Sequence, residues 1–179
     1  MTKKEAIKAA QADVRAGKDR KAVFETYKPM VPRPLHLASA IASVPREEAK
    51  SANRVLNLVL VGLLLLAGLL KAVGLFGALA STNVLLAMGL AIVSVAVPFL
   101  FAYEVNRFNG QIYGILTILA AASLLNALIR LPEAPVSGLI FAVLLGAILA
   151  LSIVLRTKVA PAFKAFGVKT DGSGNYLLG

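Results

Sequence analysis

The sequence predicts an all-α integral membrane protein, a four-transmembrane-helix bundle with a short, helical and basic N-terminal appendage on the cytoplasmic side. The chain is 58% hydrophobic, whereas a typical soluble domain is about 45–50% apolar. The excess is concentrated in four runs that follow one another closely: 55–79, 84–103, 111–129 and 136–155. Each approaches or exceeds the roughly 20 residues that a helix needs to cross a hydrocarbon core of about 30 Å.

Residues 1–54 form the predicted cytoplasmic or interfacial appendage. They carry 12 Lys/Arg and 6 Asp/Glu, and their apolar residues recur at helical spacing, which is not typical of a disordered tail. Helices are expected over 3–16, 20–27 and 35–44, followed by one that starts near Pro45 and runs straight into the first span. Because such short helices are marginal alone, they should pack against one another or lie on the membrane surface.

The distribution of basic residues predicts the topology. Four spans place both termini on one side of the membrane, and that side then holds 17 of the 19 Lys/Arg. By the positive-inside rule both termini are cytoplasmic, in a plasma membrane and most simply a bacterial inner membrane. The first apolar run begins at Val55, so we expect an uncleaved insertion signal rather than a cleavable signal peptide.

Residues 156–179 are predicted to form a cytoplasmic, basic and amphipathic tail. Val159, Phe163 and Phe166 alternate there with lysines, as in an interfacial helix. The last residues, 176–179, are apolar enough to fold back or to contact a partner.

A polar cluster is predicted where the spans end on the outer side. Ser123, Asn126 and Arg130 lie at i, i+3 and i+7, which places them on one helix face. Lys71 lies 17 residues after Arg54, about 26 Å along a helix, and therefore near the same interface. Glu133 follows Arg130 closely. The hypothesis is that Lys71, Asn126, Arg130 and Glu133 contact a partner or lipid headgroups; the alternative is a local ion pair plus an interhelical amide bond from Asn126.

The last span carries a stripe of small residues at a strict spacing of four: Gly138, Ala142, Gly146 and Ala150. Small residues at this spacing let another helix approach closely. The stripe predicts helix packing, inside the bundle rather than at a dimer seam.

The sequence argues against catalysis and against nucleic acid as a partner. No histidine or acidic residue lies inside a predicted span, the chain has no cysteine, and it contains none of the common hydrolase, metalloprotease or nucleotide-binding motifs. We therefore expect no enzyme, no metal site and no cofactor. The net charge of +10 is accounted for by topology and by a bilayer with anionic headgroups.

The remaining class is a protein that acts through contacts with a membrane protein, as an accessory, assembly or immunity-type protein. Four spans, cytoplasmic termini and fewer than 200 residues resemble the architecture of immunity proteins that guard against pore-forming bacteriocins, although the long N-terminal segment departs from it. The resemblance implies a toxin as the partner. A homo-oligomer, as a small channel or transporter, is the alternative. Glu104 is the nearest carboxylate, but it stands at the cytoplasmic end of its span, which weakens proton coupling.

Overall fold

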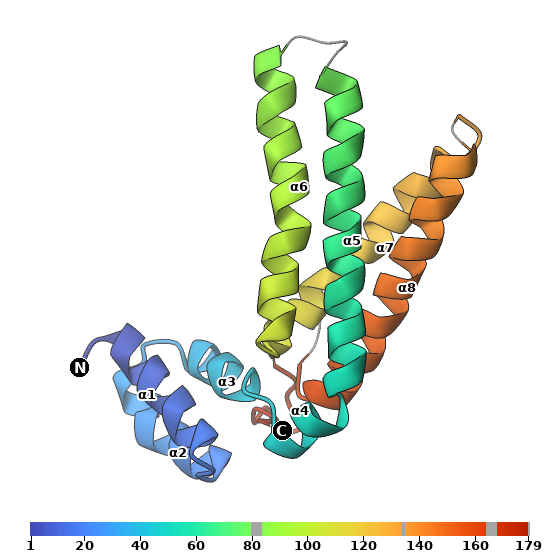
Figure 1. Cartoon of the computed structure of the whole chain (residues 1–179). Coiled ribbons are helices and arrows are strands. Elements are labelled where there is room, and N and C mark those ends of the chain that lie inside the picture. Colours follow the sequence, from blue (N-terminus) through green and yellow to red (C-terminus); the bar gives the residue numbers. More distant parts are fainter. Residues whose placement is uncertain (80–83, 134, 164–167, 179) are drawn as a thin grey trace. The chain divides into compact units, whose positions relative to one another are not determined.

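The computed structural model of the chain describes residues 1–79, 84–133, 135–163 and 168–178, and the side chains of all of these except 74–79 and 84–93. Every regular element in these residues is a helix, which confirms the all-α class (Figure 1). The helices are α1 Lys3–Arg15, α2 Arg20–Tyr27, the 3-10 helix η1 Lys28–Met30, α3 Pro34–Ala42, α4 Glu47–Ala52, α5 Arg54–Leu79, α6 Val84–Asn106, α7 Gly110–Ile129 and α8 Pro135–Val159.

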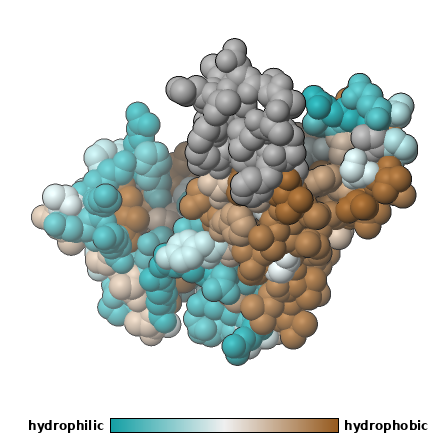
Figure 2. Space-filling view, turned by 45° about the horizontal axis from the view of Figure 1, so that its top comes forward, coloured by the Kyte–Doolittle hydropathy of each residue, from teal (hydrophilic) through white to brown (hydrophobic). Residues whose placement is uncertain are grey.

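Three described stretches are long and apolar enough to cross a membrane: Arg54–Val73 of α5, the whole of α7 and the whole of α8. Only 22% to 28% of each is buried inside the protein, and Figure 2 shows the broad hydrophobic surface that results. Such a surface is costly in water and is stable in lipid, so these helices are those of a membrane protein. Part of α6, the expected turn at 81–83 and Ala134 lie outside the described residues or side chains.

The chain divides into two compact units. The bundle unit contains Val55–Arg107 and Leu116–Ser152, and the terminal unit contains Met1–Arg54, Phe108–Ile115 and Ile153–Gly179. The N-terminal segment and the tail, which the sequence predicted as separate regions, thus belong to one unit.

The terminal unit is built on three short amphipathic helices that pack on one another. Thr2 and Glu5 form a capping box at the start of α1, and Asp19 caps α2. The helices bury side chains such as Val14, Phe24 and Ile41 in one cluster, so the expectation that they pack together is confirmed.

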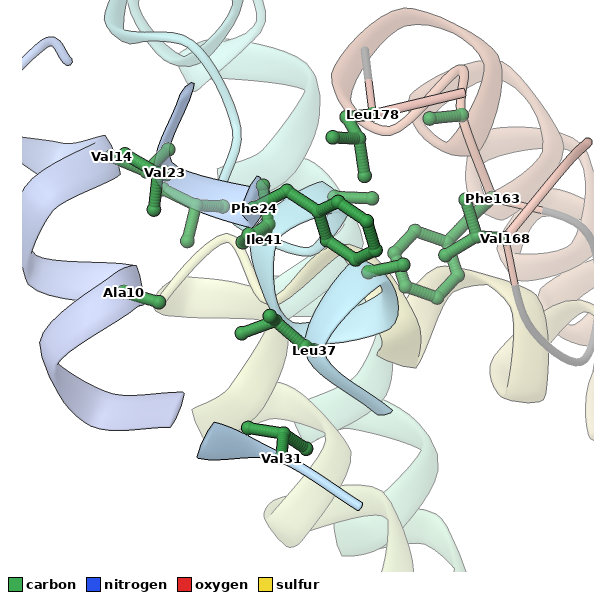
Figure 3. Packing of buried hydrophobic residues seen from close by; sticks show 14 of the residues in the cluster. Ala10, Val14, Val23, Phe24, Val31, Leu37, Ile41, Phe163, Val168 and Leu178 are labelled. Atoms are coloured by element: carbon green, nitrogen blue, oxygen red, sulfur yellow. The ribbon is translucent and has the colours of Figure 1, made fainter. Parts of the chain in front are cut away.

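The tail completes the core of the terminal unit. Phe163, Val168 and Leu178 are buried in the same cluster as Phe24 (Figure 3), and the ring of Tyr176 meets that of Phe24 edge-on with centroids 5.7 Å apart. The predicted fold-back of the last apolar residues is confirmed up to Leu178, whereas Gly179 lies outside the described residues.

The predicted amphipathic helix over 156–179 is wrong beyond Val159. The helix ends there, two residues before Pro161, and the chain instead forms antiparallel bridges between Phe163 and Val168 and between Thr170 and Tyr176. Proline disfavours helical geometry in the residue before it. Burial against the N-terminal helices then stabilises a conformation that local amphipathic pattern does not predict. Phe166 lies outside the described residues.

Arg20 ties the two ends of the chain together. Its Nη1 donates to the carbonyl of Leu178 at 2.6 Å, and its Nη2 donates to the carbonyl of Val44 at 2.7 Å. Burial, and secondarily the charge of Arg46, lower the pKa of the Arg20 guanidinium, which nevertheless remains charged in proteins. One buried cation thereby satisfies two carbonyl oxygens from distant segments.

The predicted continuous helix from Pro45 into the first span is interrupted at Asn53. This residue leaves helical geometry, with φ −112° and ψ 12°. Its side-chain Nδ2 donates to the carbonyl of Ala49 at 2.8 Å, and its backbone N–H donates to that of Lys50 at 3.3 Å. Asparagine side chains compete with backbone hydrogen bonds in this way, which ends α4 one residue before α5 begins.

Within the bundle unit, polar side chains join neighbouring helices. Asn57 on α5 is buried and its Nδ2 donates to the carbonyl of Val105 on α6 at 2.9 Å. Thr117 on α7 and Ser152 on α8 lie 3.1 Å apart between hydroxyl oxygens. The expectation that Ser152 hydrogen-bonds within or between helices is confirmed, because it also donates to the carbonyl of Leu149. Such bonds align the helices that form the site described next.

Candidate functional site

A cavity of about 300 Å³ lies in the bundle unit where α7 ends and α8 begins. Its polar lining comes from three helices and the turn between two of them: Lys71 of α5, Ser123 and Asn126 of α7, Arg130 directly after α7, and Ser137 of α8. Its apolar lining is Ala127, Gly138, Phe141 and Leu145. The cavity therefore has a polar, cationic side and an apolar side.

Helix geometry explains why these residues meet. Ser123, Asn126 and Arg130 follow one face of α7, as their spacing predicts. The connection from α7 to α8 takes only residues 130–134, so the first turn of α8 lies beside the last turn of α7 and brings Ser137 to the same place. Sequence reasoning missed Ser137, although this short connection was a usable signal for it.

Three of the four residues in the predicted polar cluster are brought together, and the fourth is not. Lys71, Asn126 and Arg130 line the cavity, whereas Glu133 does not. The only described link between Glu133 and Arg130 is a backbone hydrogen bond, from the N–H of Glu133 to the carbonyl of Arg130 at 3.1 Å. The expected ion pairs of Glu133 with Arg130 and with Lys71 are therefore wrong for the residues that the structure describes.

The charge of the cavity is positive and is not balanced by its own lining. Lys71 and Arg130 are cationic, and no carboxylate is among the lining residues. The ion pairs found in the described part of the chain join Lys18 to Asp13, Lys28 to Glu25 and Lys50 to Glu47, all in the terminal unit. Because α7 ends and α8 begins here, their dipoles offset each other, and the two side chains determine the field.

The small-residue stripe of α8 is only partly covered. Ala142 is buried, and a Cβ on Gly138 would lie 3.1 Å from the side chain of Leu131. Among the described residues no atom lies within 4 Å of a Cβ placed on Gly146, and Ala150 is exposed. The prediction of close packing inside the bundle is therefore wrong at Gly146 and Ala150, and this half of the stripe opens outward.

The tightest glycine contact in the bundle unit lies elsewhere. A Cβ on Gly68 of α5 would approach the ring of Phe99 on α6 to 2.8 Å. The absence of a side chain at Gly68 is what lets the Phe99 ring lie against α5. Close packing inside the bundle thus uses Gly68, and α8 keeps its glycine at 146 uncovered.

The rest of the described surface offers less specific chemistry. In the described part of the chain no three His, Cys, Asp or Glu residues gather as metal ligands. A larger groove of about 1350 Å³ on the terminal unit mixes basic residues such as Arg20 and Lys28 with acidic ones such as Glu25 and Asp171. Because both signs are present, this groove has no clear charge preference.

No protein-family model, no curated protein and no solved structure matches this chain.

Proposed function

We propose that this chain is a non-enzymatic protein of the plasma membrane that crosses it four times and acts through contact with a partner membrane protein, as accessory, assembly and immunity-type proteins do. The observation that carries the proposal is the open half of the α8 stripe. At Gly146 no described atom covers the helix, and large apolar side chains nearby, such as Val143, are exposed. A surface of this shape admits the backbone of another helix.

Four crossings are supported by α6 and by the charge distribution. Helix α6 has 23 residues, almost all apolar, and therefore has the length of a span. With four spans, Lys71 and Arg130 are the only Lys/Arg assigned to the outer side. An odd number of crossings would divide the basic termini between the two sides of the membrane.

Reporter fusions test this topology. Fusions at Gly179 and before Met1 should both report the cytoplasm, while fusions after Asn83 and Ala134 should report the opposite side. The physical reason is the positive-inside rule applied to the 17 basic residues assigned to one side. Opposite signals from the two termini would show an odd number of crossings and would end the four-span proposal.

Photocrosslinking tests the partner contact. Because the chain has no cysteine, Gly146→Cys can be labelled with benzophenone-maleimide in native membranes as the single reactive site. Gly62→Cys on α5 is the matched control, because Gly62 is also a glycine in a span with no described atom within 4 Å of its Cβ. We expect a discrete adduct with another membrane protein from Gly146 and none from Gly62.

The mass of the adduct separates the candidate functions. An adduct of two copies of this chain would favour the homo-oligomer and with it the channel or transporter alternative. Equal, diffuse labelling from both positions would mean that α8 faces lipid at Gly146, and the contact proposal would be wrong.

A further inference from the structure

The cavity lined by Lys71, Asn126 and Arg130 has a charge that calls for a ligand. Two cations share one cavity, and no carboxylate lines it. Like charges held close together in an apolar surrounding repel each other, and the repulsion is relieved when an anion binds between them. We propose that this cavity binds a phosphate-bearing anion, either the headgroup of an anionic phospholipid or a free phosphate.

The donor set fits a phosphate group. The planar guanidinium of Arg130 can donate two parallel hydrogen bonds to phosphate oxygens, and the ammonium of Lys71 supplies a second point charge. The neutral donors that line the same cavity, the amide of Asn126 and the hydroxyl of Ser123, can bond the remaining oxygens.

The apolar side of the cavity and its depth favour an amphiphile. Phe141 and Leu145 of α8 line the cavity together with the two cations, so a ligand with a charged head and an apolar chain would satisfy both sides. Lys71 lies about 26 Å along α5 from Arg54, which places it near headgroup level if α5 crosses a hydrocarbon core of about 30 Å. This step rests on the proposed four-span function.

The simpler reading is that Lys71 and Arg130 merely extend toward bulk headgroups at the interface. That reading predicts many exchangeable lipids and no dependence on this particular pair of cations. A built site predicts one lipid per chain and loss of that lipid when the pair is neutralised.

The test uses the full chain, purified in a neutral detergent and examined by native mass spectrometry. Dioleoylphosphatidylglycerol is added in one arm and dioleoylphosphatidylcholine in a second. In a third arm, inorganic phosphate is compared with chloride at equal ionic strength, with the melting temperature as the readout. We expect one phosphatidylglycerol per chain in excess over phosphatidylcholine, and at least about tenfold weaker retention by Lys71→Gln/Arg130→Gln, since two charge-assisted contacts are lost.

Matched variants separate charge at the cavity from charge in general. Arg156→Gln/Lys158→Gln removes the same charge from the last turn of α8 and should bind as the parent does. Lys71→Arg/Arg130→Lys keeps both charges and should retain most of the binding, which also shows that substitution at these positions leaves the fold intact.

Each outcome decides the proposal. A melting temperature raised by phosphate in the parent but not in Lys71→Gln/Arg130→Gln, without lipid retention, would identify a free phosphate as the ligand. Equal retention of both lipids by the parent, or retention of phosphatidylglycerol unchanged by Lys71→Gln/Arg130→Gln, with no effect of phosphate, would overturn the site. The reporter fusions test the four-span proposal independently, so failure of one is distinguishable from failure of the other.

Discussion

Replacing Phe24 with alanine should destabilise the terminal unit by about 3–5 kcal/mol, the usual cost of removing a buried phenylalanine from a core. Phe24 is 7% exposed, packs in the same cluster as Ile41 and Phe163, and meets Tyr176 edge-on. Since the tail shares this core, the effect should reach residues 168–178, far away in sequence. Amide hydrogen exchange of the full chain in detergent should show faster exchange in both α1–α3 and the tail, by about two orders of magnitude or more.

Leu35→Ala is the control for this experiment. Leu35 lies in the same N-terminal segment but is 45% exposed, so its removal should change exchange only slightly. If Phe24→Ala accelerated exchange in α1–α3 and left the tail protected, the two ends would not share a core, and the assignment of both to one unit would be wrong.

Replacing Arg20 with alanine should release the tail. The substitution removes both charge-assisted hydrogen bonds, to the carbonyls of Val44 and Leu178, and leaves those oxygens without this donor. Hydrogen bonds to charged groups contribute about 1.5–3 kcal/mol each, so a combined loss of about 2–4 kcal/mol is expected. Trypsin should then cleave more rapidly after Lys169, whose N–H and carbonyl are bonded to Ala162 and Leu177 in the folded tail.

Lys21→Ala removes a neighbouring, exposed basic residue and serves as the matched control. The rate of cleavage after Lys169 should stay at the parent level in this variant. Were Arg20→Ala cleaved at the same rate as Lys21→Ala, the two hydrogen bonds would contribute nothing to holding the tail.

Patterns that depend on local spacing were predicted from the sequence with small errors. The apolar run 55–79 corresponds to α5 at Arg54–Leu79, and 111–129 corresponds to α7 at Gly110–Ile129. The reason is that a helix satisfies its own backbone hydrogen bonds, so its extent follows from its own residues. The same holds for Asn126 and Arg130, which share a helix face by their spacing alone.

Features that depend on which surfaces meet could not be read from spacing. The tail has an amphipathic pattern, yet Phe163, Val168 and Leu178 gain more burial against α2 and α3 than a surface helix would give them. The break at Asn53 likewise depends on a choice between two sets of hydrogen bonds that the sequence allows equally.

The two glycine positions show the same division most clearly. The amino-acid sequence by itself determined that the chain is an all-α membrane protein and that Lys71, Asn126 and Arg130 belong near one end of its spans. Only the tertiary structure decided that Gly68 is covered by Phe99 while no described atom covers Gly146, and that Glu133 stays outside the cavity. Glycine permits close approach wherever it occurs, but whether another helix arrives is set by the packing of all the helices together.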